Sequence, residues 1–263
     1  MDNNNFYIKY ANKNSLKDDD YYYILNNYLS KLRLNFTNKD IDKIIIFLNE
    51  IFNYNNYVNL VGNKEKEEIF FRHIIDCISI FNLTDYFNQE ILKEKNIIDV
   101  GTGAGLPGVL LSILLKDSKI FLLEKSKKKV NFLKDIIKKL ELSNIDIINF
   151  SAEDILKEKK FREFFDIVTA RAVTKINILL ELVIPFSKIN GKIFLYKSRK
   201  VYQEAIEYNK LIKKMGCNIS KIEEINIPYL DEFRAILIIE KIKKTPKIFP
   251  RNLSVIKKSE IYY

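Results

Sequence analysis

The spacing of apolar residues changes once along the chain, near residue 96. Before it, apolar side chains recur every three or four positions in three segments, 21–34, 37–52 and 65–81, as they do in amphipathic helices. After it, short apolar runs alternate with amphipathic segments, as strands alternate with helices in α/β proteins. The pattern therefore predicts a helical N-terminal extension followed by an α/β domain.

The α/β part contains enough apolar runs for a large sheet. Strands are expected at 96–100, 119–124, 145–150, 166–170, 192–197, 221–227 and 234–241, and helices at 107–116, 127–140, 174–185 and 200–215. Only residues 228–233 separate the last two strands, which is hairpin spacing. We therefore expect a seven-stranded, mostly parallel sheet that ends in an antiparallel C-terminal hairpin.

These elements divide the chain into four parts. We expect a disordered or loose segment at 1–20, the helical extension at 21–92, the α/β domain at 93–245 and a basic tail at 246–263.

The stretch Asn96–Gly108 contains four of the seven glycines of the protein. An apolar run precedes these glycines, and Pro107 follows the first three of them where a helix would begin, since proline lacks an N–H that a helix N-terminus leaves unpaired anyway. A strand, a glycine turn and a helix N-terminus bring a nucleotide-like ligand against bare backbone. The stretch therefore predicts a cofactor site in an α/β fold of the Rossmann type.

Two cofactor classes use such a turn. Gly103-x-Gly105-x-x-Gly108 satisfies the dinucleotide fingerprint of NAD and FAD enzymes. Asp99-x-Gly101-x-Gly103-x-Gly105 satisfies the acidic-first pattern of methyltransferases that use S-adenosylmethionine (SAM). In that register Asp99 ends the strand and faces the ligand crevice, where a carboxylate attracts an ammonium or sulfonium group. The spacing and the C-terminal hairpin favour SAM, and the dinucleotide remains the alternative.

Two further strand ends carry candidate cofactor contacts. Glu124 lies 23 positions after Gly101, at the end of the second strand, where either cofactor class needs a carboxylate for ribose hydroxyls. Ala152 and Glu153 follow the third strand, where an adenine would lie, although Ser151 and Glu153 could equally cap a helix. Glu124 could also be a solvated charge before a lysine-rich helix.

The end of the fourth strand carries Arg171 but neither an Asn/Asp-Pro-Pro-aromatic turn nor a cysteine nucleophile. Arg171 would face the crevice and could hold an anion or stack on a purine, or could simply pair with a carboxylate. His73, the only histidine, lies beside Arg72 and Asp76 on a predicted helix. A lone helical histidine is more often a packed or surface residue than a catalyst.

Composition restricts the remaining chemistry. The net charge of +10 permits a polyanionic partner without demonstrating one, because the Lys-, Asn- and Ile-rich composition is that of an AT-rich genome. One histidine and two unpaired cysteines make a metal site and a disulfide framework improbable. No signal peptide and no apolar run of membrane-spanning length are visible. These features indicate a cytoplasmic protein without a metal or a membrane partner.

Several motifs together carry a resemblance to a known family. The chain resembles the bacterial small-subunit rRNA guanine-N7 methyltransferases known as RsmG or GidB. The shared pieces are Asn59-Leu60, Arg72-His73-x-x-Asp76, Asp99–Gly108, Leu123-Glu124, Lys128-Lys129, Ala152-Glu153, Ala170-Arg171-Ala172, Leu195–Lys197, Arg234 and Phe249–Arg251. Glu124 stands for the usual Asp of the family and Ser198 for its usual Gly.

The resemblance implies a Rossmann-like SAM-dependent methyltransferase fold. SAM would contact Asp99, Gly101, Gly103, Gly105, Leu106, Glu124, Ala152, Glu153 and Arg171. No catalytic residue is assigned with certainty, and the candidates are His73 and Arg171. The expected RNA contacts are Arg72, Lys128, Lys129, Lys197, Arg234 and Arg251.

The implied reaction moves the methyl group of SAM to N7 of a guanine in the 530 loop of 16S rRNA. N7 carries a bare lone pair, so the transfer needs no base, nucleophile or metal, and orientation can supply the catalysis. The expected partner is 16S rRNA or the small ribosomal subunit, and the expected state is a monomer. The alternatives are a SAM-dependent methyltransferase of another RNA or of a small molecule, and a non-catalytic ribosome-assembly factor.

Overall fold

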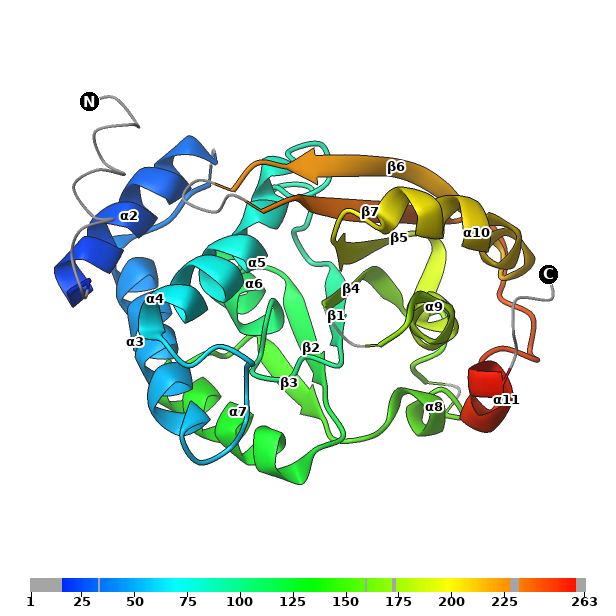
Figure 1. Cartoon of the computed structure of the whole chain (residues 1–263), viewed down its shortest axis with the longest axis horizontal. Coiled ribbons are helices and arrows are strands. Elements are labelled where there is room, and N and C mark those ends of the chain that lie inside the picture. Colours follow the sequence, from blue (N-terminus) through cyan, green and yellow to red (C-terminus); the bar gives the residue numbers. More distant parts are fainter. Residues whose placement is uncertain (1–15, 33, 159, 172–173, 228–231, 259–263) are drawn as a thin grey trace.

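The computed structural model of the chain describes residues 16–32, 34–158, 160–171, 174–227 and 232–258. It contains one seven-stranded sheet with helices on both faces (Figure 1). None of the helices in these ranges is long and apolar enough to span a membrane.

Two long helices begin the described chain, α2 (Asp18–Lys31) and α3 (Asn38–Asn55). Helix α2 starts three residues before the predicted 21, because Asp18, Asp19 and Asp20 form its first turn, where acidic groups favour the positive end of the helix dipole. Helix α3 starts at the predicted capping sequence, where the Asp40 carboxylate accepts a hydrogen bond from the Thr37 N–H at 2.8 Å. Residues 1–15 of the predicted loose segment lie outside the described residues.

The segment predicted as one helix over 65–81 consists of four short helical pieces. These are α4 (Lys66–Ile69), a π-helical turn η1 (Phe70–Ile75), α5 (Asp76–Ile78) and a 3-10 turn η2 (Ser79–Asn82). The Arg72 carbonyl in η1 accepts a hydrogen bond from Arg171 at 2.6 Å, a tertiary contact that a sequence period does not reveal. A π turn inside a helix often marks a functional segment.

The strands occur in the order β3-β2-β1-β4-β5-β7-β6. Their bounds are β1 (Asn96–Val100), β2 (Lys119–Leu123), β3 (Ile145–Ile148), β4 (Phe165–Arg171), β5 (Ser187–Lys197), β6 (Cys217–Ile225) and β7 (Arg234–Lys241). Strands β1 to β5 pair in parallel, and β7 runs antiparallel to both β5 and β6. The predicted α/β fold with its antiparallel C-terminal hairpin is confirmed.

Strands β5 and β6 begin earlier than the sequence predicts, at Ser187 instead of 192 and at Cys217 instead of 221. The start of β5 is polar and exposed, and its register shifts against β4. Strand β6 is at the edge of the sheet, and most of its side chains are partly or fully exposed. Neither segment has the continuous apolar run that identifies a buried strand.

The helices of the α/β part connect successive strands. They are α6 (Gly108–Leu114), α7 (Lys127–Lys139), α8 (Ala152–Ile155), α9 (Ile176–Val183) with the 3-10 turn η3 (Ile184–Phe186), and α10 (Val201–Lys214). After β7 the chain ends in α11 (Leu253–Lys258).

Two large apolar clusters cover the two faces of the sheet. One joins the N-terminal helices to α6 and α7, with Leu48, Leu111 and Leu133 among its buried members. The other joins α9 and α10 to the opposite face. In Figure 1 the blue and cyan helices α2 to α5 lie together on one side, and α8 to α11 lie on the other. The N-terminal extension therefore shares its core with the α/β domain.

Candidate active site

The glycine turn connects the carboxyl end of β1 to α6. The amides of Gly101 and Thr102 both donate to the Leu123 carbonyl, at 2.9 and 3.1 Å, which ties the turn to the end of β2. Gly103 has a φ of +60°, a region that L side chains rarely adopt. An added Cβ there would meet no atom closer than 3.9 Å, so the turn presents bare backbone to open space at this residue.

The neighbouring Gly105 serves packing. Its φ is +92°, and an added Cβ would lie 2.5 Å from Cγ2 of Val109. Leu106, expected to contact SAM, is buried in the cluster that joins the N-terminal helices to the sheet. Both residues therefore hold the turn against α6 and α7 and lie behind the surface that a ligand would touch.

Asp99 lies beneath the turn, and its carboxylate faces inward. The residue is 0% exposed, and Oδ2 accepts hydrogen bonds from the Thr102 hydroxyl at 2.6 Å and the Gly108 N–H at 2.9 Å. Burial raises the pKa of Asp99 to about 6, against the lowering effect of these hydrogen bonds. This corrects the expectation that Asp99 faces the ligand crevice, because the donors of the turn itself occupy the carboxylate.

Glu124 connects the end of β2 to the same turn. Its Oε2 accepts a hydrogen bond from the Gly103 N–H at 3.0 Å, and its Oε1 accepts one from the Ser126 N–H at 2.8 Å. A carboxylate has about four lone-pair sites, so two remain for other donors. The side chain is 8% exposed and lines a cavity.

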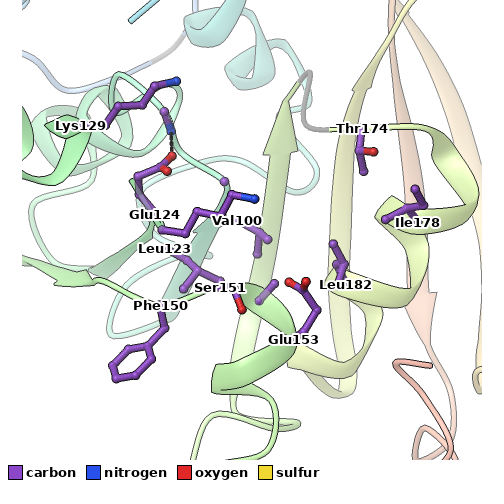
Figure 2. A pocket seen from close by; sticks show the side chains of 14 residues that line it. Val100, Leu123, Glu124, Lys129, Phe150, Ser151, Glu153, Thr174, Ile178 and Leu182 are labelled. Atoms are coloured by element: carbon purple, nitrogen blue, oxygen red, sulfur yellow. Dashed lines mark hydrogen bonds between the residues drawn. The ribbon is translucent and has the colours of Figure 1, made fainter. Parts of the chain in front are cut away.

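That cavity encloses about 380 Å³ at the carboxyl ends of β1, β2 and β3. Figure 2 shows Glu124 and Lys129 on one side of it and Thr174, Ile178 and Leu182 on the other. The predicted residues in its lining are Gly101, Gly103, Glu124, Lys129, Ala152 and Glu153. Asp99, Gly105, Leu106 and Arg171 are not among the residues that line it.

Sequence reasoning missed the apolar walls of this cavity, which include Val100, Leu123, Ile178 and Leu182. Ile178 and Leu182 lie four positions apart on α9, so they face the same side of that helix. Nothing in the local sequence separates them from ordinary core residues. Phe150 also lines the cavity and is 56% exposed, and an aromatic residue directly after the third strand is the one feature of the sequence that could have indicated it.

The alternative capping role considered for 151–153 applies to Ser151 alone. Its hydroxyl accepts a hydrogen bond from the Asp154 N–H at 3.2 Å at the start of α8. Glu153 instead contributes to the cavity lining.

A second cavity, of about 340 Å³, lies at the carboxyl ends of β4 and β5. Strand β4 pairs directly with β1, so the two cavities occupy neighbouring strand ends on one edge of the sheet. The second cavity is lined by Asp76, Arg171, Tyr196, Lys197, Ser198 and Arg234.

Arg171 is held in place by the N-terminal helices. Its Nε donates to Asp76 Oδ2 at 2.8 Å, and one terminal nitrogen donates to the Arg72 carbonyl at 2.6 Å and to Nδ1 of His73 at 2.8 Å. The carboxylate pairing weighed as an alternative for Arg171 is therefore present, with a partner from α5. The ends of the guanidinium are oriented before any ligand binds.

His73 is fixed on both sides. Nδ2 of Asn63 donates to Glu68 at 3.1 Å, which leaves Oδ1 of Asn63 to accept from Nε2 of His73 at 2.9 Å. Nδ1 of His73 then carries the lone pair that accepts from Arg171. Burial and the charges of Arg171, Arg72 and Arg234 lower the pKa of His73 to about 3. The neutral ring keeps no free lone pair for a substrate proton, and it positions Arg171.

Most cations expected to contact RNA already have acidic partners. Arg72 and Arg234 both bind Glu232, at 2.6 and 2.7 Å, and Lys197 binds Glu204 at 2.6 Å. Lys128 is exposed at the start of α7.

Arg251 also has an acidic partner. Its Nε donates to the fully buried Glu181 at 2.9 Å, and its backbone N–H donates to the same carboxylate. This pair ties the C-terminal segment to α9, so Arg251 has a structural role.

Among residues 16–258 as far as the structure describes them, no three His, Cys, Asp or Glu side chains form a group that could hold a metal ion.

The strand order, the antiparallel β7 and a glycine-turn cavity at the carboxyl ends of β1 and β2 define a Rossmann-like methyltransferase. The sequence model of the family described as rRNA small subunit methyltransferase G (GidB) matches residues 40–235, and the chain belongs to this family.

Two relatives named for the same activity match most of the chain. The ribosomal RNA small subunit methyltransferase G of Clostridium perfringens (strain SM101) is 34% identical over 241 residues, which cover 92% of this chain and 99% of the relative. The protein of the same name from Thermoanaerobacter sp. (strain X514) is 36% identical over 211 residues, 80% and 86% of the two chains.

Among solved structures, a SAM-dependent methyltransferase from Aquifex aeolicus aligns with a TM-score of 0.48 at 16% identity and covers 65% of this chain and 92% of its own. An rRNA methylase from Streptococcus thermophilus aligns with a TM-score of 0.47 at 14% identity, covering 63% and 97%.

Proposed function

We propose that this protein transfers a methyl group from SAM to N7 of a guanine in the 530 loop of 16S rRNA. The observation that carries the proposal is the pair of cavities on neighbouring strand ends, one lined by bare backbone and carboxylates and the other by arginines and a tyrosine. The family membership supports an rRNA substrate, because the relatives are named for small-subunit rRNA methylation.

The first cavity fits the chemistry of SAM. The turn at Gly103 leaves room for close approach to backbone, and Glu124 keeps lone pairs for two ribose hydroxyls. Ile178 and Leu182 offer apolar surface to an adenine ring, and Glu153 adds a second carboxylate near a cationic ligand. When bound, SAM would supply an electrophilic methyl group.

The second cavity suits a guanine. Arg171 and Arg234 present planar guanidinium groups, which donate to base oxygens and stack on aromatic rings. The phenolic hydroxyl of Tyr196 donates to the Cys77 carbonyl at 2.8 Å, so its ring position is fixed. These side chains would hold the base and exclude water while N7 faces the neighbouring cavity.

The proposed reaction requires no general base. N7 of guanine carries a lone pair and no proton, so no proton has to leave before the attack. His73 is neutral with both nitrogens engaged, and burial raises the pKa of the Cys77 thiol above its ordinary value. Fixed orientation of the two reactants can lower a barrier by about 7–11 kcal/mol.

An rRNA substrate would place the protein in the cytoplasm, where ribosomes are assembled. Both cavities are built from one chain, so we propose that it acts as a monomer on 16S rRNA or on the small subunit.

The substrate assignment is tested in a bacterial strain that lacks its own 16S rRNA guanine-N7 methyltransferase of this family. Borohydride reduction followed by aniline cleaves RNA at N7-methylguanosine. We expect 16S rRNA from the deletion strain to lack one scission in the 530 loop and this gene to restore it. An unrestored scission, with the protein present and folded, would reject the proposed substrate.

A further inference from the structure

Two arginines at the rim of the second cavity share one carboxylate. A terminal nitrogen of Arg72 lies 2.6 Å from Oε1 of Glu232, and a terminal nitrogen of Arg234 lies 2.7 Å from Oε2. Each oxygen of Glu232 therefore has its own guanidinium. A carboxylate held in this way occupies the position that a phosphate group also fits, since arginine forks bind both groups with the same geometry.

Arg234 is oriented without help from Glu232, and the backbone of Arg72 is fixed independently of it. Nε of Arg234 lies 3.2 Å from the buried Asp76, and another nitrogen of Arg234 donates to the Phe233 carbonyl at 3.1 Å. Arg72 belongs to η1, whose backbone carbonyl at Arg72 is held by Arg171. Loss of the Glu232 contacts would therefore leave the guanidinium of Arg234 positioned beside Asp76, and that of Arg72 on a fixed backbone next to it.

The charges at this rim favour an anion in place of Glu232. Asp76 faces both Arg171 and Arg234, so one carboxylate compensates two guanidinium groups. Glu68 lies 3.8 Å from Nε of Arg72, a longer contact between side chains that are 40% and 44% exposed. Glu232 itself is 32% exposed, and ion pairs at this exposure contribute little to stability. An incoming anion could therefore displace its side chain into solvent at small cost.

We infer that Arg72 and Arg234 form a binding site for a backbone phosphodiester of the RNA substrate, and that Glu232 occupies this site until RNA arrives. The inference rests on the proposed function, because Arg234 also lines the cavity assigned to the guanine. A phosphate bound at the rim would belong to a nucleotide next to the methylated base. The exchange replaces one singly charged anion by another, so the positive charges of the two arginines stay neutralised to the same extent.

The test compares RNA binding by the wild-type protein and Glu232→Gln. The probe is a fluorescein-labelled RNA hairpin with the 530-loop sequence, and the readout is fluorescence anisotropy across a salt series. We expect Glu232→Gln to bind about three- to tenfold more tightly at low salt, since charge-assisted contacts are no longer opposed. The slope of log K against log salt should stay the same, because the same phosphate is bound in both proteins and only the competing carboxylate is removed.

Glu224→Gln is the matched control. Glu224 pairs with Ala235 across the β6–β7 ladder, next to Arg234, and its carboxylate accepts from Tyr202. The control thus removes the same charge nearby and leaves the Glu232 contacts intact. Equal effects of the two substitutions, or weaker binding by Glu232→Gln, would overturn the inference.

A third variant, Arg72→Gln, is made both in the wild-type protein and in Glu232→Gln. We expect it to weaken RNA binding more in Glu232→Gln than in the wild type, and equal losses would contradict a shared site. Inorganic phosphate is titrated into the protein–RNA complex at constant ionic strength, to distinguish a site for RNA phosphate from a site for free phosphate. Displacement of the RNA by low millimolar phosphate would assign the site to free phosphate instead. Binding is measured without methyl transfer, so tighter binding by Glu232→Gln stands even if the borohydride–aniline test fails.

Discussion

Gly103 combines a backbone conformation that favours glycine with open space for a ligand. Its amide is held by Glu124, its φ is positive, and the space beyond it is open. A side chain there would meet both a strained backbone and the cavity proposed for SAM.

We predict that Gly103→Arg abolishes SAM binding in calorimetry, because the side chain fills the cavity that the glycine leaves open. Gly62→Arg is the matched control, since Gly62 has no atom within 4 Å of an added Cβ and no positive φ. The control should bind SAM as the wild type does. Retained binding in a folded Gly103→Arg protein, or binding of NAD by the wild type, would contradict the assignment of this cavity.

His73 makes a prediction about pH. Its pKa falls from 6.5 to about 3 on folding, so the stability it contributes is complete above about pH 6.5 and is lost as the pH falls toward 3. At pH 5 the loss is about 1–2 kcal/mol, from 1.36 kcal/mol for each pKa unit. We therefore expect the advantage of wild type over His73→Gln in urea unfolding to shrink by this amount between pH 7.5 and about 5.

The raised pKa of Asp99 acts in the opposite direction. A carboxyl group whose pKa rises to about 6 on folding adds stability as the pH falls through 6 toward 4. Asp99 is present in both proteins, so its contribution cancels in the difference between wild type and His73→Gln. A difference that stays constant with pH would show that His73 is not buried in its neutral form.

Single residues also show where sequence reasoning reaches its limit. The spacing of Glu124 from Gly101 predicted a carboxylate at the turn, because that spacing reflects the length of a β-α-β unit. The same reasoning placed Asp99 in the crevice, although its inward orientation depends on hydrogen bonds from Thr102 and Gly108. Whether a strand-end side chain points to the ligand or into the turn is decided by such contacts, which the pattern does not contain.

At the scale of elements, the C-terminal segment is held against the α/β domain by polar contacts of two arginines. Arg162 donates to the carbonyls of Thr245, Pro246 and Phe249, and Arg251 binds Glu181 on α9. Ile256 of α11 packs with Ile178 and Leu182, whose helix lines the cofactor cavity. The segment thus supports one wall of that cavity.

We predict that Arg251→Ala lowers the free energy of unfolding by about 3–5 kcal/mol, because it leaves the carboxylate of Glu181 buried without its guanidinium. Lys157→Ala is the control, since it removes one member of an exposed pair with Asp154 and should change stability little. Urea unfolding measures both. The salt dependence of RNA binding should not change in Arg251→Ala, and a slope reduced by about one phosphate would restore Arg251 as an RNA contact.

Elements differ in how far their sequence predicts them. Helix α7 and strand β1 were predicted within a residue or two, because each has one strong apolar period that matches its burial. The segment around Arg72 and His73 has a helical period but forms a π turn, since tertiary contacts with Arg171 hold its backbone. The start of β5 was missed because residues 188–190 are exposed and the register against β4 is interrupted between Ser187 and Lys192, so no continuous apolar run marks it.

For the molecule as a whole, the order of the elements was the most predictable property. Alternating apolar runs, short connections and a final hairpin spacing predicted a mostly parallel sheet with an antiparallel C-terminal hairpin, and the structure has that sheet, in the order β3-β2-β1-β4-β5-β7-β6. The predicted boundary at residue 92, between the helical extension and the α/β domain, does not separate two cores. Leu48 of α3 belongs to the same apolar cluster as Leu111 and Leu133. The cavity beside the glycine turn and the cavity lined by Arg171 and Arg234 lie next to each other because β1 and β4 are neighbours in this sheet.

The central claim is that these two cavities serve methyl transfer from SAM to guanine N7. Small ribosomal subunits from the deletion strain are incubated with purified protein and SAM, and nucleosides of the 530-loop fragment are analysed by mass spectrometry. The account predicts N7-methylguanosine in this fragment with the wild-type protein and with Gly62→Arg, and none with Gly103→Arg. Wild-type protein that binds SAM but leaves this fragment unmethylated on both small subunits and free 16S rRNA would contradict it.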